Sequence, residues 1–180
     1  MPYAAMRILA LLVVALAVVH APASAAYAQD HTKTTRLAWL EASIVDELNR
    51  VRTARGLQPL RTAPSLRSAA RSHSKAMLDV GFFGHDSADG TAFSDRIKRF
   101  YPTRGWSSWS VGEALMASPG GQAEPAVVVR TWLDSPPHRQ IILSPRWRDL
   151  GIGALYAPLA PREFGNADTI VVTADFGLRR

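Results

Sequence analysis

Residues 132–139 read Trp-Leu-Asp-Ser-Pro-Pro-His-Arg, and this stretch joins the end of one helix to the start of the next. The helix before it is expected to begin at Pro125, because apolar side chains follow at helical spacing. Ser135 is a residue type that caps helices, and Pro136 is favoured at the first helical position. We therefore expect a new helix to begin at Pro136, with His138 in its first turn.

Three further helices are expected on the N-terminal side of this stretch, because apolar residues recur there with a helical period. They cover residues 37–55, 64–80 and 93–101. A glycine or proline follows each of them, and both residue types commonly end helices. His73 lies on the apolar stripe of the second helix.

The C-terminal part of the chain is typical of β-structure. Residues 150–156 are apolar and interrupted by glycine, and residues 169–174 are rich in Val, Ile and Thr. The short stretch 111–115 suits either a strand or the start of a helix. Because helices come first and strands last, an α+β layered domain is favoured over a doubly wound one.

Composition excludes several classes of protein. The chain has 180 residues, a length that suits one domain, and no cysteine, so it has no disulfide framework, no thiolate metal site and no cysteine nucleophile. The net charge of +6 comes from scattered Lys and Arg without an aromatic stripe, so we expect no nucleic-acid partner. No phosphate-binding glycine motif occurs, so we expect no nucleotide cofactor.

The first 28 residues have the features of a secretory signal peptide. A positively charged start precedes the apolar run 8–19, and Ala26-Tyr27-Ala28 fits a cleavage site, with residues 23–25 as the alternative site. The alternative is an uncleaved anchor. We expect a flexible lead-in over residues 29–36 and one domain over residues 37–180, located in the periplasm or outside the cell. No second apolar run in the mature chain is long enough to span a membrane.

Three side chains could form a chemical site. His85 lies in a loop between two glycines, His138 lies in the first turn of a predicted helix, and Glu113 is an acid within an apolar segment. Two imidazoles and a carboxylate could hold a divalent metal such as zinc, or perform acid–base chemistry. The alternative is that each residue makes only local hydrogen bonds. We expect the three side chains to converge within about 5–6 Å, and a separation beyond about 10 Å would exclude a shared site.

Three other polar residues are weaker candidates. His73 is expected to be a core or cleft-wall histidine with one ring nitrogen hydrogen-bonded, although a functional role is the alternative. Asp134 is a candidate additional acid but suits a helix end, and Ser135 suits a helix cap. No G-x-S-x-G motif is present, so no serine nucleophile is indicated and we do not expect an enzyme.

Taken in order, these motifs resemble the bacterial branch of the CAP superfamily. This superfamily comprises cysteine-rich secretory proteins, antigen five and pathogenesis-related proteins, and its domain is also called the SCP-like extracellular domain. The resembling segments are residues 48–52, 56–60, 70–77, 83–87, 111–113, 132–139, 150–153 and 175–177.

The resemblance implies an α-β-α sandwich with four to five helices around a three-stranded antiparallel sheet. It also implies a solvent-filled cleft lined by His85, Glu113 and His138, which in some family members binds a divalent metal, often zinc. The chain departs from the family at Ala114, where an Asn is usual. It also lacks the second Glu and the second His of the eukaryotic members, so that His138 would supply the second imidazole.

Three functions are compatible with these observations. The first is a secreted, monomeric binding module whose ligand or envelope partner the sequence does not identify. The second is a zinc-dependent hydrolase that uses His85, Glu113 and His138. The third is lipid or sterol binding along an aromatic wall, for which the alternative is ordinary core packing of Phe100, Tyr101, Trp106 and Trp109.

Overall fold

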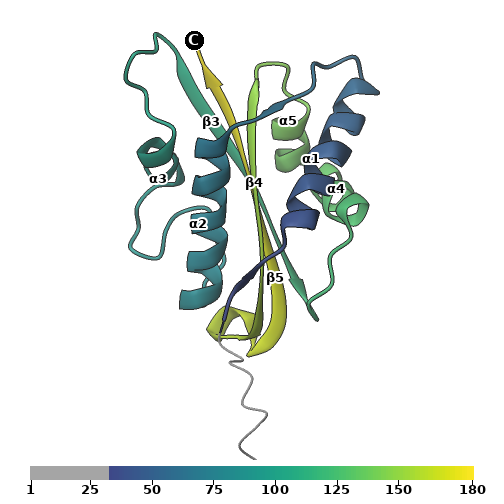
Figure 1. Ribbon diagram of the computed structural model, residues 1–180, viewed down its shortest axis with the longest axis vertical. Coiled ribbons are helices and arrows are strands. Elements are labelled where there is room, and N and C mark those ends of the chain that lie inside the picture. The colour runs from purple at the N-terminus through teal and green to yellow at the C-terminus, as the bar shows by residue number, and fades with distance from the viewer. Residues whose placement is uncertain (1–32) are drawn as a thin grey trace, which may run out of the picture.

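The computed structural model describes residues 33–180, in which one sheet lies between two layers of helices (Figure 1). The long strands are β3 (Trp109–Pro119), β4 (Asp149–Ala160) and β5 (Ala167–Arg179), and β5 lies between the other two. Strand β5 is antiparallel to both β3 and β4. The two-residue strands β1 (Thr35–Arg36) and β2 (Arg61–Thr62) both pair with β4, β1 antiparallel to it and β2 parallel. The α+β sandwich is confirmed, with two short strands more than the three expected.

The helices divide between the two faces of the sheet. On one face lie α1 (Ala38–Thr53), α4 (Pro125–Asp134) and α5 (Pro136–Ile142), and on the other lie α2 (Pro64–Val80) and α3 (Phe93–Phe100) (Figure 1). A short 3-10 helix, η1 (Arg162–Phe164), joins β4 to β5. All five predicted α-helices are present, and each begins within one residue of its expected start.

The ambiguous stretch 111–115 is part of strand β3. Its side chains alternate between the two layers, as the pleat of a strand requires. Ala114 packs with the α1 and α4 core, whereas Val111 and Leu115 pack on the side of α2 and α3. Glu113 therefore lies on the α2 and α3 side, between these two apolar neighbours.

Helix α2 lies directly on two glycines of β4. A Cβ atom built at Gly151 would be 2.1 Å from the carbonyl carbon of Leu66, and one at Gly153 would be 2.4 Å from that of Ala70. The Ser74 hydroxyl reinforces this contact by donating to the Gly153 carbonyl at 2.9 Å. Backbone contact of this kind fixes the height and register of α2 on the sheet.

The last two residues of the expected lead-in belong to the sheet. Thr35 and Arg36 form β1 because their backbones pair with Tyr156 and Leu155, and the Arg36 guanidinium donates to Glu41. The predicted signal peptide lies outside the described residues. None of the helices within residues 33–180 is both long and apolar enough to cross a membrane.

Candidate histidine–carboxylate site

Glu113 joins two chain segments that are remote in the sequence. His85 Nδ1 donates to Glu113 Oε1 at 2.8 Å, and the Arg96 guanidinium donates to Oε2. The Glu113 side chain is 1% exposed and that of His85 is 49% exposed. The predicted approach of His85 to Glu113 is confirmed, and the imidazole connects this buried acid to the surface.

His138 approaches the same place from the other helical layer. Its ring centroid is 6.3 Å from that of His85, in an edge-on arrangement. This spacing is just beyond the expected 5–6 Å and well below 10 Å. The two rings can meet because β3 is a terminal strand of the sheet, so that α5 and the loop after α2 approach it from opposite faces.

The loop that carries His85 is held at both ends. Helix α2 ends at Gly81, whose φ of +77° favours glycine, and the Asp86 carboxylate accepts from the Phe93 backbone N–H at 3.0 Å. His73 Nε2 donates to the Gly84 carbonyl at 2.9 Å. These bonds position His85 before any ligand binds.

The pKa values of the exposed His85 and the half-buried His138 shift in opposite directions. The hydrogen bond to Glu113 raises the pKa of His85 above its ordinary value, against the effect of partial burial. Partial burial, and then the positive charge of His85, lower the pKa of His138. Burial would raise the pKa of Glu113, but the bonds from His85 and Arg96 hold it below its usual range. Glu113 is therefore ionised and accepts at both oxygens.

These opposite shifts should be visible in an imidazole titration followed by NMR. We expect the midpoint of His85 to lie above the ordinary value of about 6.5 and that of His138 to lie below it. Glu113→Gln removes the charged acceptor, so the His85 midpoint should fall while His138 changes less. Equal midpoints in the wild-type protein would contradict this assignment.

Within residues 33–180, none of the weaker candidates is hydrogen-bonded to His85, Glu113 or His138. His73 is 1% exposed with one ring nitrogen bonded to Gly84, which confirms its prediction as a core histidine. Asp134 is exposed at the end of α4. Ser135 occupies the N-cap position of α5, as predicted, but its hydroxyl makes no capping hydrogen bond.

Two ionisable residues near Glu113 were not predicted. Arg96 lies on the inward stripe of α3, between Phe93 and Phe100, and is 6% exposed. Asp175 lies directly opposite Glu113 on β5 and is fully buried. Its carboxyl oxygens have no hydrogen-bond partner within the described part of the chain. Burial, and then the Glu113 charge, raise the pKa of Asp175 well above its usual range, so Asp175 is a neutral acid.

The donor set does not fit a divalent metal ion. Within residues 33–180, no three His, Asp or Glu side chains converge to hold one. Both oxygens of Glu113 are already hydrogen-bonded, and Asp175 is neutral. The Arg96 guanidinium is permanently charged and contacts the one ionised carboxylate of this group. These residues therefore give no support to a reaction that depends on zinc.

The geometry supports hydrogen bonding by a pre-positioned imidazole. Because His85 donates through Nδ1, its Nε2 is the atom free to contact a ligand or a water molecule. A ring oriented by a carboxylate can also act as a general base. No serine or threonine hydroxyl of the described residues is hydrogen-bonded to His85 or His138, so a nucleophile–base pair is not formed.

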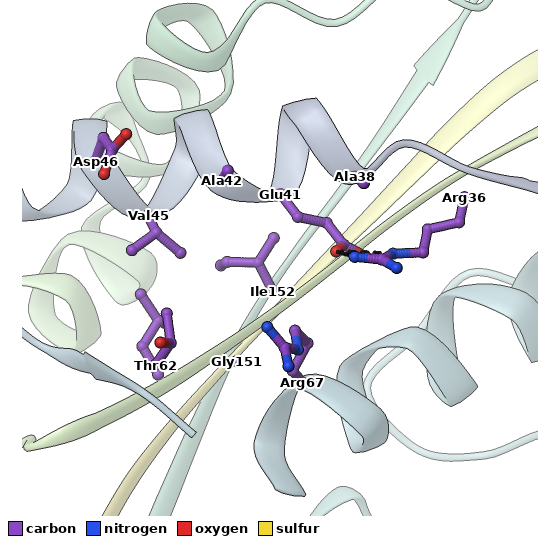
Figure 2. Close-up of a pocket in the computed structure, with 11 residues that line it drawn as sticks. Arg36, Ala38, Glu41, Ala42, Val45, Asp46, Thr62, Arg67, Gly151 and Ile152 are labelled. Atoms are coloured by element: carbon purple, nitrogen blue, oxygen red, sulfur yellow. Dashed lines mark hydrogen bonds and ion pairs between the residues drawn. The ribbon is translucent and has the colours of Figure 1, made fainter. Parts of the chain in front are cut away.

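A separate cavity lies between α1 and α2 at the β4 edge (Figure 2). It has a volume of about 280 Å³ and an apolar floor that includes Ile152. Figure 2 shows Glu41 reaching Arg36 beside it, and Glu41 also accepts two hydrogen bonds from Arg71, at 2.8 and 2.6 Å. None of the five prominent cavities of residues 33–180 is lined by His85 or His138.

The aromatic segment proposed as a lipid wall packs largely into a core cluster. Tyr101 is fully buried, and Phe100 and Trp109 pack against its cluster with Leu66. Of the four aromatic residues, Trp106 alone is substantially exposed, at 47%. These residues therefore give lipid binding no support.

Known proteins resemble this chain in sequence and in fold. The family model described as "CAP: Cysteine-rich secretory protein family" matches residues 45–167. The uncharacterized protein YkwD of Bacillus subtilis is 34% identical over 113 residues, which cover 63% of this chain and 41% of YkwD. The chain therefore spans about two fifths of the length of this curated relative.

Two solved structures share the fold. An extracellular protein containing a SCP domain from Bacillus anthracis has a TM-score of 0.58 and 26% identity, covering 77% of this chain and 40% of that one. An outer surface protein from Borrelia burgdorferi has a TM-score of 0.63 and 19% identity, covering 83% of this chain and 99% of that one. With the family model covering most of its length, the chain belongs to the cysteine-rich secretory protein (CAP) family.

Proposed function

We propose that this CAP domain acts outside the cytoplasm as a binding module for a component of the cell envelope. In this proposal residues 1–28 are a signal peptide, and His85, Glu113 and His138 form the ligand site. The observation that carries the proposal is the 2.8 Å hydrogen bond from His85 to Glu113. A buried carboxylate holds a half-exposed imidazole in place, which lowers the entropic cost of binding a polar ligand.

The relatives support the proposed location. One structural relative is named as an extracellular protein and another as an outer surface protein. The sequence features of the first 28 residues agree with export. The absence of cysteine means that the domain would need no oxidative folding after export.

Co-sedimentation with purified bacterial cell-wall sacculi tests the proposed function. At physiological salt we expect the wild-type protein to sediment with the sacculi. Replacing both His85 and His138 by Gln should weaken binding by about tenfold, since two ligand hydrogen bonds at about 0.7 kcal/mol each would be lost.

Arg130→Gln is the matched control for this experiment. Arg130 is an exposed residue of α4, so its substitution lowers surface charge without touching the site. Wild-type protein that stays in the supernatant would contradict the proposal. An equal loss of binding in the control and in the double variant would show adsorption by charge alone, which also contradicts it.

A further inference from the structure

Arg96 balances the negative charge of Glu113 by direct contact. Its guanidinium contacts Glu113 Oε2, while His85 contacts Oε1 at 2.8 Å. The side chains of Arg96 and Glu113 are 8% and 1% exposed, so water screens their charges little. The carboxylate is thus neutralised from within the protein.

We propose that Arg96 supplies the positive charge of the histidine–carboxylate site in place of a metal ion. It holds Glu113 in position and keeps divalent metal ions out, so that His85 and His138 bind their ligand by hydrogen bonds. The inference rests on the proposed function only for the location of the site. It also defines the class of ligand. Two imidazoles without a metal ion bind polar oxygen groups by hydrogen bonds, whereas a metal centre would bind groups that coordinate the ion.

The charge inventory around Glu113 supports this assignment. The ionisable groups that face it are Arg96 from α3, His73 from α2, His85 from the preceding loop and Asp175 from β5. His73 is buried and uncharged because burial lowers its pKa, and Asp175 keeps its proton. Among these groups Glu113 carries the one negative charge, and Arg96 already balances it. A divalent ion would add two positive charges beside a buried guanidinium, which is electrostatically unfavourable.

Removing Arg96 leaves the negative charge of Glu113 without its balancing positive charge. Glu113 would then have a free oxygen, and Asp175, which lies opposite it in the strand register, could ionise beside an arriving cation. Together with His85 these groups offer two carboxylates and an imidazole, a donor set that suits zinc. Latent metal binding after loss of Arg96 is therefore the specific consequence of the proposal.

The test compares zinc binding by calorimetry in the metal-stripped full chain and its variants. Arg96→Lys keeps the positive charge, and Arg96→Gln keeps a hydrogen-bond donor but removes the charge. We expect the wild-type protein and the Lys variant to show no His85-dependent zinc binding. The Gln variant should bind zinc about tenfold more tightly or better, and adding His85→Ala should abolish this gain. Histidines outside the site contribute equally to every variant.

Two results would overturn the proposal. One is wild-type zinc binding that His85→Ala removes, and the other is a folded Arg96→Gln protein, verified by circular dichroism, without any gain in affinity. If the Gln variant does not fold, the comparison of wild type with His85→Ala decides: equal zinc affinity supports the proposal and unequal affinity overturns it. Failure to bind sacculi would refute the proposed function and leave the zinc result unchanged.

Discussion

Gly153→Ala is expected to destabilise the domain by about 3 kcal/mol or more, enough to lower its Tm by roughly 10 °C. The added Cβ would lie 2.4 Å from the Ala70 carbonyl carbon and the Arg71 nitrogen. Both are backbone atoms of α2, so no side chain can rotate away to make room. The whole helix must lift from the sheet, and the hydrogen bond from Ser74 to the Gly153 carbonyl would be lost with it.

Thermal and urea unfolding of purified protein measure this effect. Gly84→Ala is the matched control, because a Cβ at Gly84 meets no atom within 4 Å and its backbone is not in the left-handed region. We expect that control to change stability by no more than about 0.5 kcal/mol. If both variants unfold at the same denaturant concentration, the close packing of α2 on β4 is not as described.

The second large effect is expected at Arg52. This side chain is fully buried near the end of α1 and donates to the carbonyls of Gln58, Ile142 and Ser144, at 3.1, 2.5 and 3.0 Å. Arg52→Met fills a similar volume but leaves these carbonyls without their donor. We expect a loss of about 3 kcal/mol or more, since each unsatisfied buried acceptor costs about 1–3 kcal/mol.

Arg50→Met is the control, since Arg50 lies in the same helix turn but is 69% exposed and, among the described residues, pairs with Glu47 alone. An exposed pair of this kind contributes up to about 1 kcal/mol. Arg52 also holds the segment that follows α5, so its loss should broaden the His138 resonance in NMR spectra. Equal stability of the two variants would show that water replaces the donor at Arg52.

The full burial of Arg52, in contrast to Arg50, could not be predicted from the sequence. Both lie in the last turn of α1, and the helical period places Arg52 on the face of Leu48 and Arg50 on the opposite face, but no local signal shows that a charged side chain is fully buried there. The burial of Arg52 depends on Ile142 and Ser144, which are about ninety residues away along the chain. The helices themselves were predictable because their signals, such as Gly81 and Pro64, are local.

The candidate site could also be predicted only in part from the sequence. Its two imidazoles, His85 and His138, lie in a glycine-bounded loop and in a helix that begins with proline, and both contexts can be recognised locally. Arg96 and Asp175 were missed for different reasons. Arg96 lies on the apolar stripe of α3 and could have been noticed there. Asp175 is opposite Glu113 only through the register of two strands that lie far apart in the sequence, and no local pattern predicts that register.

The place of β5 in the sheet has a consequence for how the protein is made. β5 lies between β3 and β4 yet follows both along the chain, so neither long strand has its main partner until residues 167–179 have been synthesised. A growing chain therefore cannot complete the sheet, and Glu113 gains Asp175 as a neighbour only at the end. Closure of the sheet is therefore a late step in folding, because the long-range pairing of β5 with β3 and β4 must wait for the C-terminal strand.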